Sequence, residues 1–382
     1  MTFTLNIDGA RFEKQIANVI EDFKKLNARV VPVIKGNGYG FGRKMLAKEA
    51  HHRNLDRIAI GTIYELDQAL TNFGGQIVVL EPFNVQDRAA ARVWESAMVM
   101  SAHRVIATIS NTNLLAANQA GIKQAFIEGK TSTHRFGVTA TELLAILGNE
   151  ETDLEILGLS LHLPIAQPVN TNVAKLEISE KKKSRKNSAR VVEISNWINN
   201  FAPKFNNSGQ TLNLSVSHIS TKEVQQILDR AAKANHEISL DVRLGTSLWL
   251  GDPKALNVTG TVLEIHELTR DHEHVGYRQV DGHSFRRLLV VSGGTAHGVA
   301  LAAPAYRSTL RSKGIAIVQG IAEAFGKLRS PFKLAGKNLG FAEPPHMHVS
   351  LLWCSDRKVQ VGDQLECTVR NTTAVFDEVV IN

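Results

Sequence analysis

The chain has 382 residues, of which 43% are hydrophobic and 21% are charged, a globular composition that excludes disorder, collagen and coiled coil as global descriptions. At about 150 residues per domain, this length predicts two or three domains. The net charge of +7 is no nucleic-acid signature by itself, and the two cysteines cannot form a disulfide framework.

Short apolar runs alternate with stretches of helical apolar spacing through residues 9–250. The predicted strands are Ala28–Ile34, Arg57–Gly61, Gln76–Leu80, Ala97–Met100, Gln124–Ile127, Leu154–Leu161, Leu212–Val216 and Ile238–Val242. The predicted helices include Phe12–Leu26, Arg43–His52, Thr139–Leu147, Ala189–Phe201 and Thr221–Ala234. Such alternation indicates a parallel sheet covered on both faces. It favours a closed (β/α)₈ barrel, with an open doubly wound sheet as the alternative.

The pattern changes near Gly251-Asp252-Pro253. Runs of shorter period follow, with few helical stretches between them: Asn257–His266, His274–Val280, Phe285–Val291, Gly314–Gln319, His348–Leu352, Gln364–Val369 and Ala374–Ile381. We therefore predict a barrel over residues 9–250 and a mostly β domain over 251–382, to which the N-terminal strand 1–8 is added.

The most informative segment is VIKGNGYGFG, residues 33–42. Lys35 follows an apolar strand and precedes a glycine-rich turn. The C-terminal ends of barrel strands carry active sites, and partial burial there would lower the lysine pKa and free its amine for Schiff-base chemistry. The glycines allow a sharp turn that lets Tyr39 reach back over the same mouth. A lysine at a strand end can equally be a surface cap.

This segment closely resembles the pyridoxal-phosphate (PLP) lysine motif of alanine racemases, a family with a PLP-bearing (β/α)₈ barrel followed by a β domain. The resemblance implies that Lys35 carries PLP covalently and acts as the base on one face of the substrate. It also implies that Tyr39 binds the cofactor phosphate.

A second match is DVRLGTSL, residues 241–248. It resembles the family segment whose arginine, here Arg243, faces the pyridine nitrogen of PLP. A guanidinium has only donors, so the ring would stay unprotonated and racemisation would be favoured over transamination. The amides of Gly245 and Thr246 could open onto the phosphate. Ser217 is a weaker phosphate candidate, from a segment that resembles related PLP-barrel proteins.

Three further segments fit the same family. Thr133–Gly137 resembles the segment whose arginine, here Arg135, contacts the PLP phenolic oxygen and the substrate carboxylate. Gly158–His162 resembles the strand whose histidine packs on the pyridine ring, although His162 alone would read as a core histidine. Val275-Gly276-Tyr277 resembles the segment whose tyrosine is the opposite-face base, donated across a head-to-tail dimer interface.

The chain departs from the family mainly on the substrate side. Glu128 stands where the family usually has a lysine, often carbamylated, and we expect its carboxylate to hold Arg135 instead. The entryway tyrosine is Thr295. The Met-Asp pair near the substrate carboxylate reads Met347-His348, so Met347 is the expected substrate contact.

These matches predict a PLP-dependent amino-acid racemase, with alanine as the substrate by resemblance and with Lys35 and Tyr277 as its two bases. We expect a head-to-tail homodimer, since Tyr277 would complete the partner's site. One alternative is a non-catalytic PLP-binding protein. Another is a PLP-dependent lyase that resembles D-threonine aldolases, with His346 and His348 as metal ligands on a β-strand; we expect instead that this pair is structural and that no metal binds.

The remaining features of the sequence indicate no further binding partner. The basic run Glu180–Lys186 predicts a solvated loop, and without interleaved aromatics it gives no nucleic-acid role. No apolar run reaches the roughly 20 residues of a membrane span, and the first residues lack a signal-peptide layout. We expect a soluble cytoplasmic protein with no membrane partner.

Overall fold

The structure is a computed structural model that describes residues 2–111, 114–147, 153–165, 188–207, 209–268, 274–277, 280–281, 287–301, 314, 317–318, 320 and 329–382. Two compact units make up the chain. The barrel unit comprises Gln15–Gly36 and Arg43–Gly251, and the β unit comprises Met1–Lys14, Asn37–Gly42 and Asp252–Asn382. The domain boundaries predicted from the sequence stay a prediction.

Eight parallel strands form the barrel: β2 (Ala28–Pro32), β3 (Arg57–Ile60), β4 (Gln76–Pro82), β5 (Val105–Ile109), β6 (Gln124–Gly129), β7 (Glu155–Leu161), β8 (Leu212–Ser217) and β9 (Ile238–Leu244). Their order is β2-β9-β8-β7-β6-β5-β4-β3. A parallel bridge between Val33 and Ala59 joins the two ends of this series, and the Ile34 amide donates to the Ala59 carbonyl over 2.8 Å. The sheet therefore closes on itself, which confirms the predicted barrel and excludes the open sheet.

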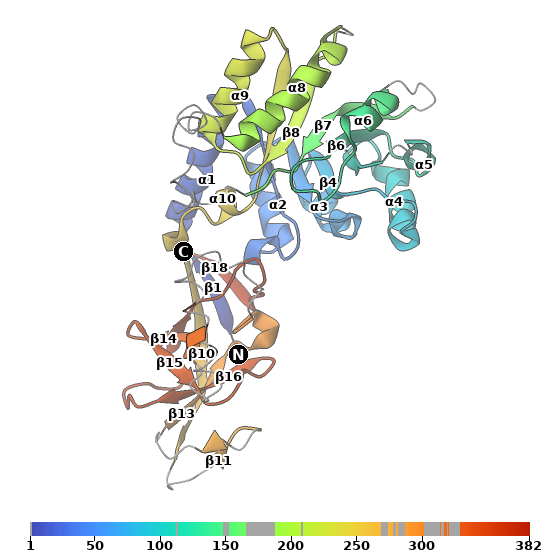
Figure 1. Ribbon diagram of the computed structural model, residues 1–382. Helices are drawn as coiled ribbons and strands as arrows, with labels where there is room; N and C mark the ends of the chain where they lie inside the picture. The colour runs from blue at the N-terminus through green and yellow to red at the C-terminus, as the bar shows by residue number, and fades with distance from the viewer. Residues whose placement is uncertain are drawn as a thin grey trace. The chain divides into compact units, whose positions relative to one another are not determined.

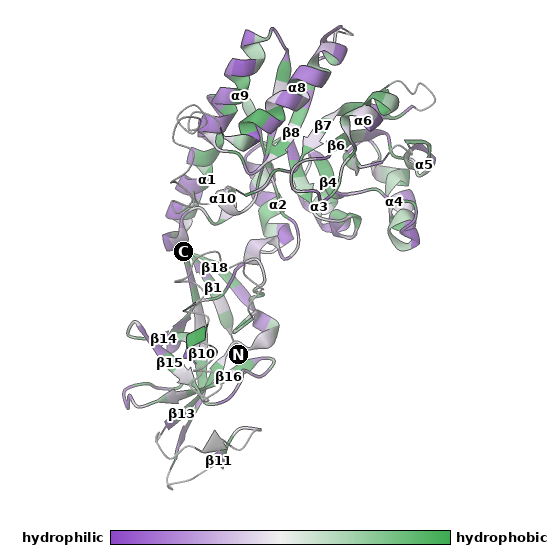
Figure 2. Cartoon of the chain, in the orientation of Figure 1, coloured by the Kyte–Doolittle hydropathy of each residue, from purple (hydrophilic) through white to green (hydrophobic). Residues whose placement is uncertain are grey.

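Helices alternate with these strands and surround them (Figure 1). They are α1 (Gly9–Lys24), α2 (Arg43–His52), α3 (Leu66–Asn72), α4 (Arg88–Ser101), α5 (Leu114–Gln119), α6 (Ala140–Leu147), α8 (Ala189–Asn207), α9 (Thr221–Lys233) and the short α10 (Thr246–Trp249). Figure 2 shows β8 largely in hydrophobic colours, while α8 and α9 mix hydrophobic and hydrophilic residues, as amphipathic helices on a sheet should. In the described residues, no helix is long and apolar enough to cross a membrane.

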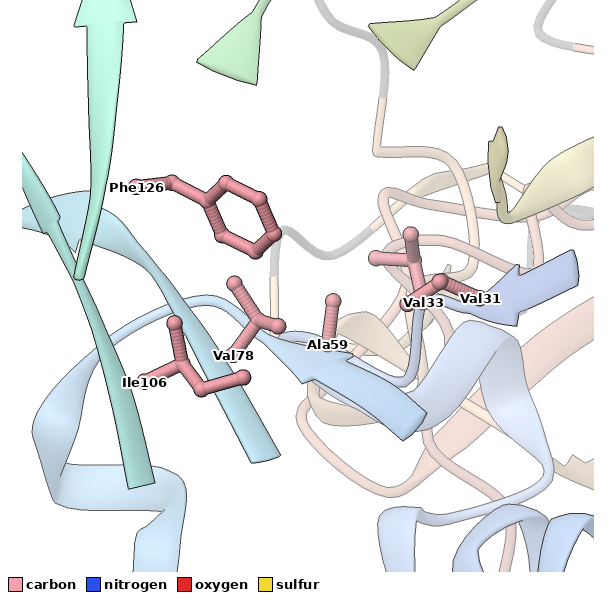
Figure 3. Close-up of a cluster of buried hydrophobic side chains, with 6 residues drawn as sticks. All are labelled: Val31, Val33, Ala59, Val78, Ile106 and Phe126. Carbon is pink, nitrogen blue, oxygen red and sulfur yellow. The ribbon is translucent and has the colours of Figure 1, made fainter. Parts of the chain in front are cut away.

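The barrel interior is filled by side chains from successive strands. Val31, Val33, Ala59, Val78, Ile106 and Phe126 form one buried cluster (Figure 3). Each of these residues comes from the strands β2 to β6 or from the bridge that follows β2. The interior of the barrel is thus a packed core.

One predicted strand is wrong. Ala97–Met100 lies inside helix α4, and the strand of this repeat is β5, which the sequence analysis missed. In α4 only Met98 of the last three apolar residues is buried, whereas Val99 and Met100 are 79% and 82% exposed. Apolar side chains on a helix surface therefore imitated a buried strand. The prediction of a strand at Gly314–Gln319 also fails, because its described residues 314, 317 and 318 are helical.

The β unit is built on β10 (Leu256–Glu267), which pairs with β13 (Arg287–Ser292), β17 (Gln364–Cys367) and β1 (Phe3–Ile7). The order β13-β16-β15-β14-β17-β10, with β10 pairing back to β13, makes a closed antiparallel barrel from these strands and β14 (Arg329–Leu334), β15 (Lys337–Phe341) and β16 (Val349–Cys354). Parallel β18 (Glu378–Ile381) extends the sheet from β1. A short hairpin, β11 (His274–Val275) and β12 (Val280–Asp281), completes the unit. This mostly β part confirms the predicted fold class.

Candidate active site

A cavity of about 230 Å³ lies at the C-terminal ends of the barrel strands. It is lined by Lys35, Gly61, Thr62, Leu80, Glu81, Arg135, Phe136, His162, Ser217, His218 and Arg243, all of the barrel unit. Parallel strands bring their C-terminal ends to one edge, so residues more than 200 positions apart in sequence meet here. The fold therefore brings together five of the predicted site residues, namely Lys35, Arg135, His162, Ser217 and Arg243.

Lys35 follows β2 and the closing bridge, and its side chain is exposed at the cavity. Partial desolvation lowers the pKa of its amine, the guanidinium groups of Arg135 and Arg243 lower it further, and only the carboxylate of Glu65 raises it. A lowered pKa increases the fraction of neutral amine, which is the nucleophilic form. The environment thus suits condensation of this amine with a carbonyl.

Arg243 lies on β9 and is buried. One terminal nitrogen donates to Ser160 Oγ over 2.8 Å and the other donates to the Leu161 carbonyl over 2.9 Å. Its Nε is buried and has no hydrogen-bond partner. Two of the three guanidinium nitrogens are therefore anchored on β7, and the third is left with an unused donor.

A buried carboxylate lies behind this arginine. Glu128 on β6 is 1% exposed, and its Oε2 accepts from Ser160 Oγ over 3.2 Å. Burial raises the pKa of Glu128, while the charges of Arg243 and Arg135 act in the opposite direction. Ser160 thus links the two charges, because its hydroxyl accepts from Arg243 and donates to Glu128.

Arg135 lies in the loop after β6, with one terminal nitrogen 3.9 Å from Glu128 Oε1. Its guanidinium lies over the Phe136 ring, 5.1 Å from the centroid. The side chain is 41% exposed, which leaves donors available to an anion in the cavity. The pairing with Glu128 has the geometry that the sequence predicts, and its role stays a prediction.

His162 packs at the end of β7 in a network with the end of β8. Its Nδ1 lies 3.1 Å from Ser217 Oγ, which also accepts from the Leu163 amide over 3.3 Å. Desolvation, followed by the charges of Arg135 and Arg243, lowers the His162 pKa to about 3, so the ring is neutral at physiological pH. Because Ser217 Oγ accepts from Leu163, its proton is available for Nδ1, and this arrangement favours the Nε2–H tautomer of His162.

The other residues that are predicted to contact the phosphate are not among those that line the cavity. Gly245 and Thr246 begin the four-residue helix α10, directly after β9. Tyr39 belongs to the β unit, where it is buried with a left-handed φ of 56°, and burial raises its pKa to about 12. Gly40 has a φ of +90°, and a Cβ there would lie 2.8 Å from the Phe376 ring, so this turn requires glycine.

Tyr277 and Met347 also belong to the β unit and are not part of the cavity lining described above. Tyr277 is 85% exposed, and its ring packs on His346 with centroids 4.5 Å apart. Glu343 Oε1 accepts from the Tyr277 amide over 3.1 Å and bonds His346 Nε2 over 2.7 Å. The roles predicted for Tyr277 and Met347 stay predictions.

The histidine pair considered for metal binding does not lie on a strand, since β16 begins at Val349. His346 bonds Glu343, whereas His348 packs on His297 with ring centroids 5.9 Å apart. Among the residues that the structure describes, no group of three or more potential ligands could hold a metal ion. The basic run Glu180–Lys186 lies outside the described residues.

Among the residues that sequence reasoning missed are His218, which lines the cavity, and Glu65, which lies beside Lys35. His218 has a left-handed φ of 58°, packs on His162, and its Nδ1 bonds the Leu163 carbonyl over 2.7 Å. Its place directly after a predicted strand was a usable signal. The Glu65 carboxylate accepts a hydrogen bond from the Gly36 amide beside Lys35. Nothing in the local sequence around Glu65 indicates that hydrogen bond.

Comparison with known proteins agrees with this architecture. Residues 7–226 match the family described as "Alanine racemase, N-terminal domain", which is more than half of the chain. The chain belongs to this family. No curated protein sequence matches it at a significant level.

Solved structures of alanine racemases share the family fold. The enzyme of Clostridium difficile 630 is 14% identical with a TM-score of 0.62, covering 97% of this chain and 87% of its own. The enzyme from E. faecalis is 14% identical with a TM-score of 0.61, covering 100% and 98%. The enzyme from Bartonella henselae, solved with covalently bound pyridoxal phosphate, is 17% identical with a TM-score of 0.60, covering 96% and 90%. At these identities the likeness shows the fold alone.

Proposed function

We propose that this protein is a PLP-dependent amino-acid racemase that interconverts L- and D-alanine. Lys35 and Tyr277 are its two bases in this proposal, and the active form is a head-to-tail homodimer. The family membership and the cavity support the cofactor. The observation that carries the proposal is the buried, unpartnered Nε of Arg243 in the same cavity as a lysine of lowered pKa.

The residues present fit PLP. A buried donor without an acceptor is costly, so Arg243 Nε needs an acceptor from a ligand, and an unprotonated pyridine nitrogen is one. The Lys35 amine suits the aldehyde group. The phosphate would be held by Tyr39, Ser217 and the amides of Gly245 and Thr246. These are the donor types that a phosphate requires.

When bound, PLP supplies the electron sink that stabilises the negative charge left at the α-carbon by proton removal. Lys35 Nζ removes or returns the α-proton on one face, and its lowered pKa increases the fraction of neutral, basic amine at a given pH. Arg243 keeps its own protons, and its Nε would donate to the ring nitrogen and leave that nitrogen unprotonated. His162, neutral with a pKa of about 3, adds no competing charge beside the ring.

Arg135 orients the substrate by binding its carboxylate. Its guanidinium is fixed from behind by Glu128 and from one side by Phe136. Fixing the carboxylate sets which bond at the α-carbon points toward Lys35, and such orientation is a large part of catalysis. Met347 would contact the same carboxylate.

Inversion requires a second proton donor on the opposite face. The Tyr277 phenol has the exposure that a group donated to another subunit needs, since its side chain is 85% exposed. An aromatic side chain this exposed is also typical of an interface residue. Gly276 has a φ of +74°, and a Cβ there would lie 2.3 Å from a Glu343 oxygen, so glycine permits the contact that fixes the Tyr277 backbone.

Chiral analysis in deuterated buffer tests the proposal. The PLP-loaded protein, given L-alanine as the only amino acid, should form D-alanine with deuterium at the α-carbon. Tyr277→Phe should lose racemisation while it keeps the PLP absorbance. Tyr64→Phe, at another exposed tyrosine, is the matched control and should behave as wild type. PLP binding without α-proton exchange over a panel of amino acids would assign a non-catalytic PLP-binding protein instead. A monomer in solution that still racemises would contradict the dimer.

A further inference from the structure

The barrel ladder is weakest between β3 and β2, the strand that precedes Lys35. The other neighbouring strands pair over several residues each, whereas β2 and β3 are joined by the single bridge between Val33 and Ala59. Beyond that bridge, the chain after β2 leaves the sheet with Lys35. The sheet offers no acceptors to the backbone amides beyond this bridge, so their partners must come from elsewhere.

The Glu65 carboxylate supplies those partners. Glu65 ends the short 3₁₀ helix η2 (Ile63–Glu65) that follows β3. Its Oε1 accepts from the Gly36 amide over 2.9 Å, and its Oε2 accepts from the Gly61 amide over 2.7 Å. One side chain therefore connects the residue after Lys35 to the end of β3, where ladder hydrogen bonds are lacking.

Gly36 and Gly61, the two residues that Glu65 connects, both lie against Lys35. A Cβ on Gly61 would lie 3.1 Å from Lys35 Cβ, so the base of the lysine side chain packs on this backbone. Gly36 has a left-handed φ of +66°, and its carbonyl accepts from the Arg43 guanidinium while its amide is held by Glu65. Gly36, the residue that follows Lys35, is thus held at both its backbone donor and its backbone acceptor.

Glu65 is also the carboxylate that raises the Lys35 pKa against the cationic side chains around the amine. The charged and titratable groups that line the cavity with this amine are Arg135, Arg243, His162, His218 and Glu81. The two arginines lower the lysine pKa and Glu65 raises it. A side chain that both holds the backbone and carries this charge can set where the amine lies and at which pH it reacts.

We propose that Glu65 is the positioning residue of Lys35: its carboxylate fixes the Gly36 and Gly61 amides so that the lysine amine meets its carbonyl partner in a reactive orientation. This inference rests on the proposed function, because it assumes that Lys35 bonds PLP. Glu65 acts through Lys35 and touches neither substrate nor cofactor.

The test compares wild type with Glu65→Gln and Glu65→Ala, in the full chain. Glutamine keeps one acceptor oxygen and removes the charge, and alanine removes both acceptors. The control is Asp67→Asn, an exposed carboxylate two residues away.

PLP is added, the amine condenses with its aldehyde and releases water, and borohydride reduces the C=N bond to a stable secondary amine. The rate of adduct formation on the Lys35 peptide is measured against pH by mass spectrometry, and amide exchange of Gly36 and Gly61 is followed without PLP.

We expect Asp67→Asn to match wild type. Glu65→Gln should form the adduct roughly 10- to 100-fold more slowly, as misplaced reacting groups do. Its pH midpoint should move to lower pH, since the charge that raises the Lys35 pKa is removed, and one or both glycine amides should exchange faster. A purely structural role would lower stability without moving the pH midpoint. Wild-type rate, midpoint and exchange in Glu65→Gln would overturn this inference alone, whereas a wild type that forms no Lys35 adduct would overturn the proposed function with it.

Discussion

Ser160→Ala should weaken the barrel far more than the loss of one hydroxyl suggests. The Ser160 hydroxyl accepts from Arg243 over 2.8 Å and donates to Glu128 over 3.2 Å. Both partners are buried, with exposed fractions of 5% and 1%. The substitution leaves a buried guanidinium nitrogen and a buried carboxylate oxygen each without this partner.

The magnitude follows from those two bonds. A hydrogen bond to a charged group contributes about 1.5–3 kcal/mol, so two lost bonds set an upper limit near 6 kcal/mol. Approach of the two charges toward each other recovers part of this, and we expect a loss of about 2–4 kcal/mol in the free energy of unfolding. For a unit of this size, the thermal midpoint should fall by about 5–12 °C.

Thermal unfolding followed by circular dichroism, without PLP, measures this loss. Ser215→Ala is the matched control, because Ser215 is equally buried and pairs with Ser160 in register across β7 and β8. It makes the same change in size next to the same core. An equal, small effect of both substitutions would refute the reasoning that Ser160 links the two charges.

Two further predictions concern the same cavity. Glu128→Ala should lower racemisation while the PLP absorbance survives, because Arg135 loses the carboxylate behind it; an unchanged rate would show that Glu128 does not hold Arg135. The His162 pKa of about 3 lies below the unfolded value near 6.5, so the unfolded state binds the extra proton and stability falls as pH drops from 6.5 toward 3. His162→Gln should therefore lose less stability than wild type between pH 7 and pH 4.5 in thermal scans, and an equal loss would contradict a neutral His162.

Several residues of the cavity could be found from the sequence because they lie at the ends of predicted strands. Lys35, His162 and Arg243 each lie just after a predicted strand, and a parallel barrel brings those ends to one edge, whereas Arg135 lies in the loop after β6. Glu65 could not be found in this way. Its contact with Gly36 depends on the seam between the first and last strands of the series, which only the closed fold creates.

Errors in the predicted elements have physical causes as well. Ala97–Met100 is an apolar run in α4 in which Val99 and Met100 are exposed, and a short apolar run does not distinguish a strand from a helix. Strands β14 and β15 were missed because Pro331 and Gly340 interrupt their apolar patterns. Their pairing with β16 and β17 comes from tertiary contacts rather than from local propensity.

The central claim is that the amine of Lys35 forms a covalent bond to PLP. The most direct measurement is borohydride reduction of the PLP-supplemented protein, followed by peptide mass spectrometry, with Lys35→Ala as the control. We predict a visible absorption band that borohydride removes and a reduced adduct on the peptide that contains Lys35, both absent in the variant. An absent band, or an adduct found only on other lysines, would contradict the account.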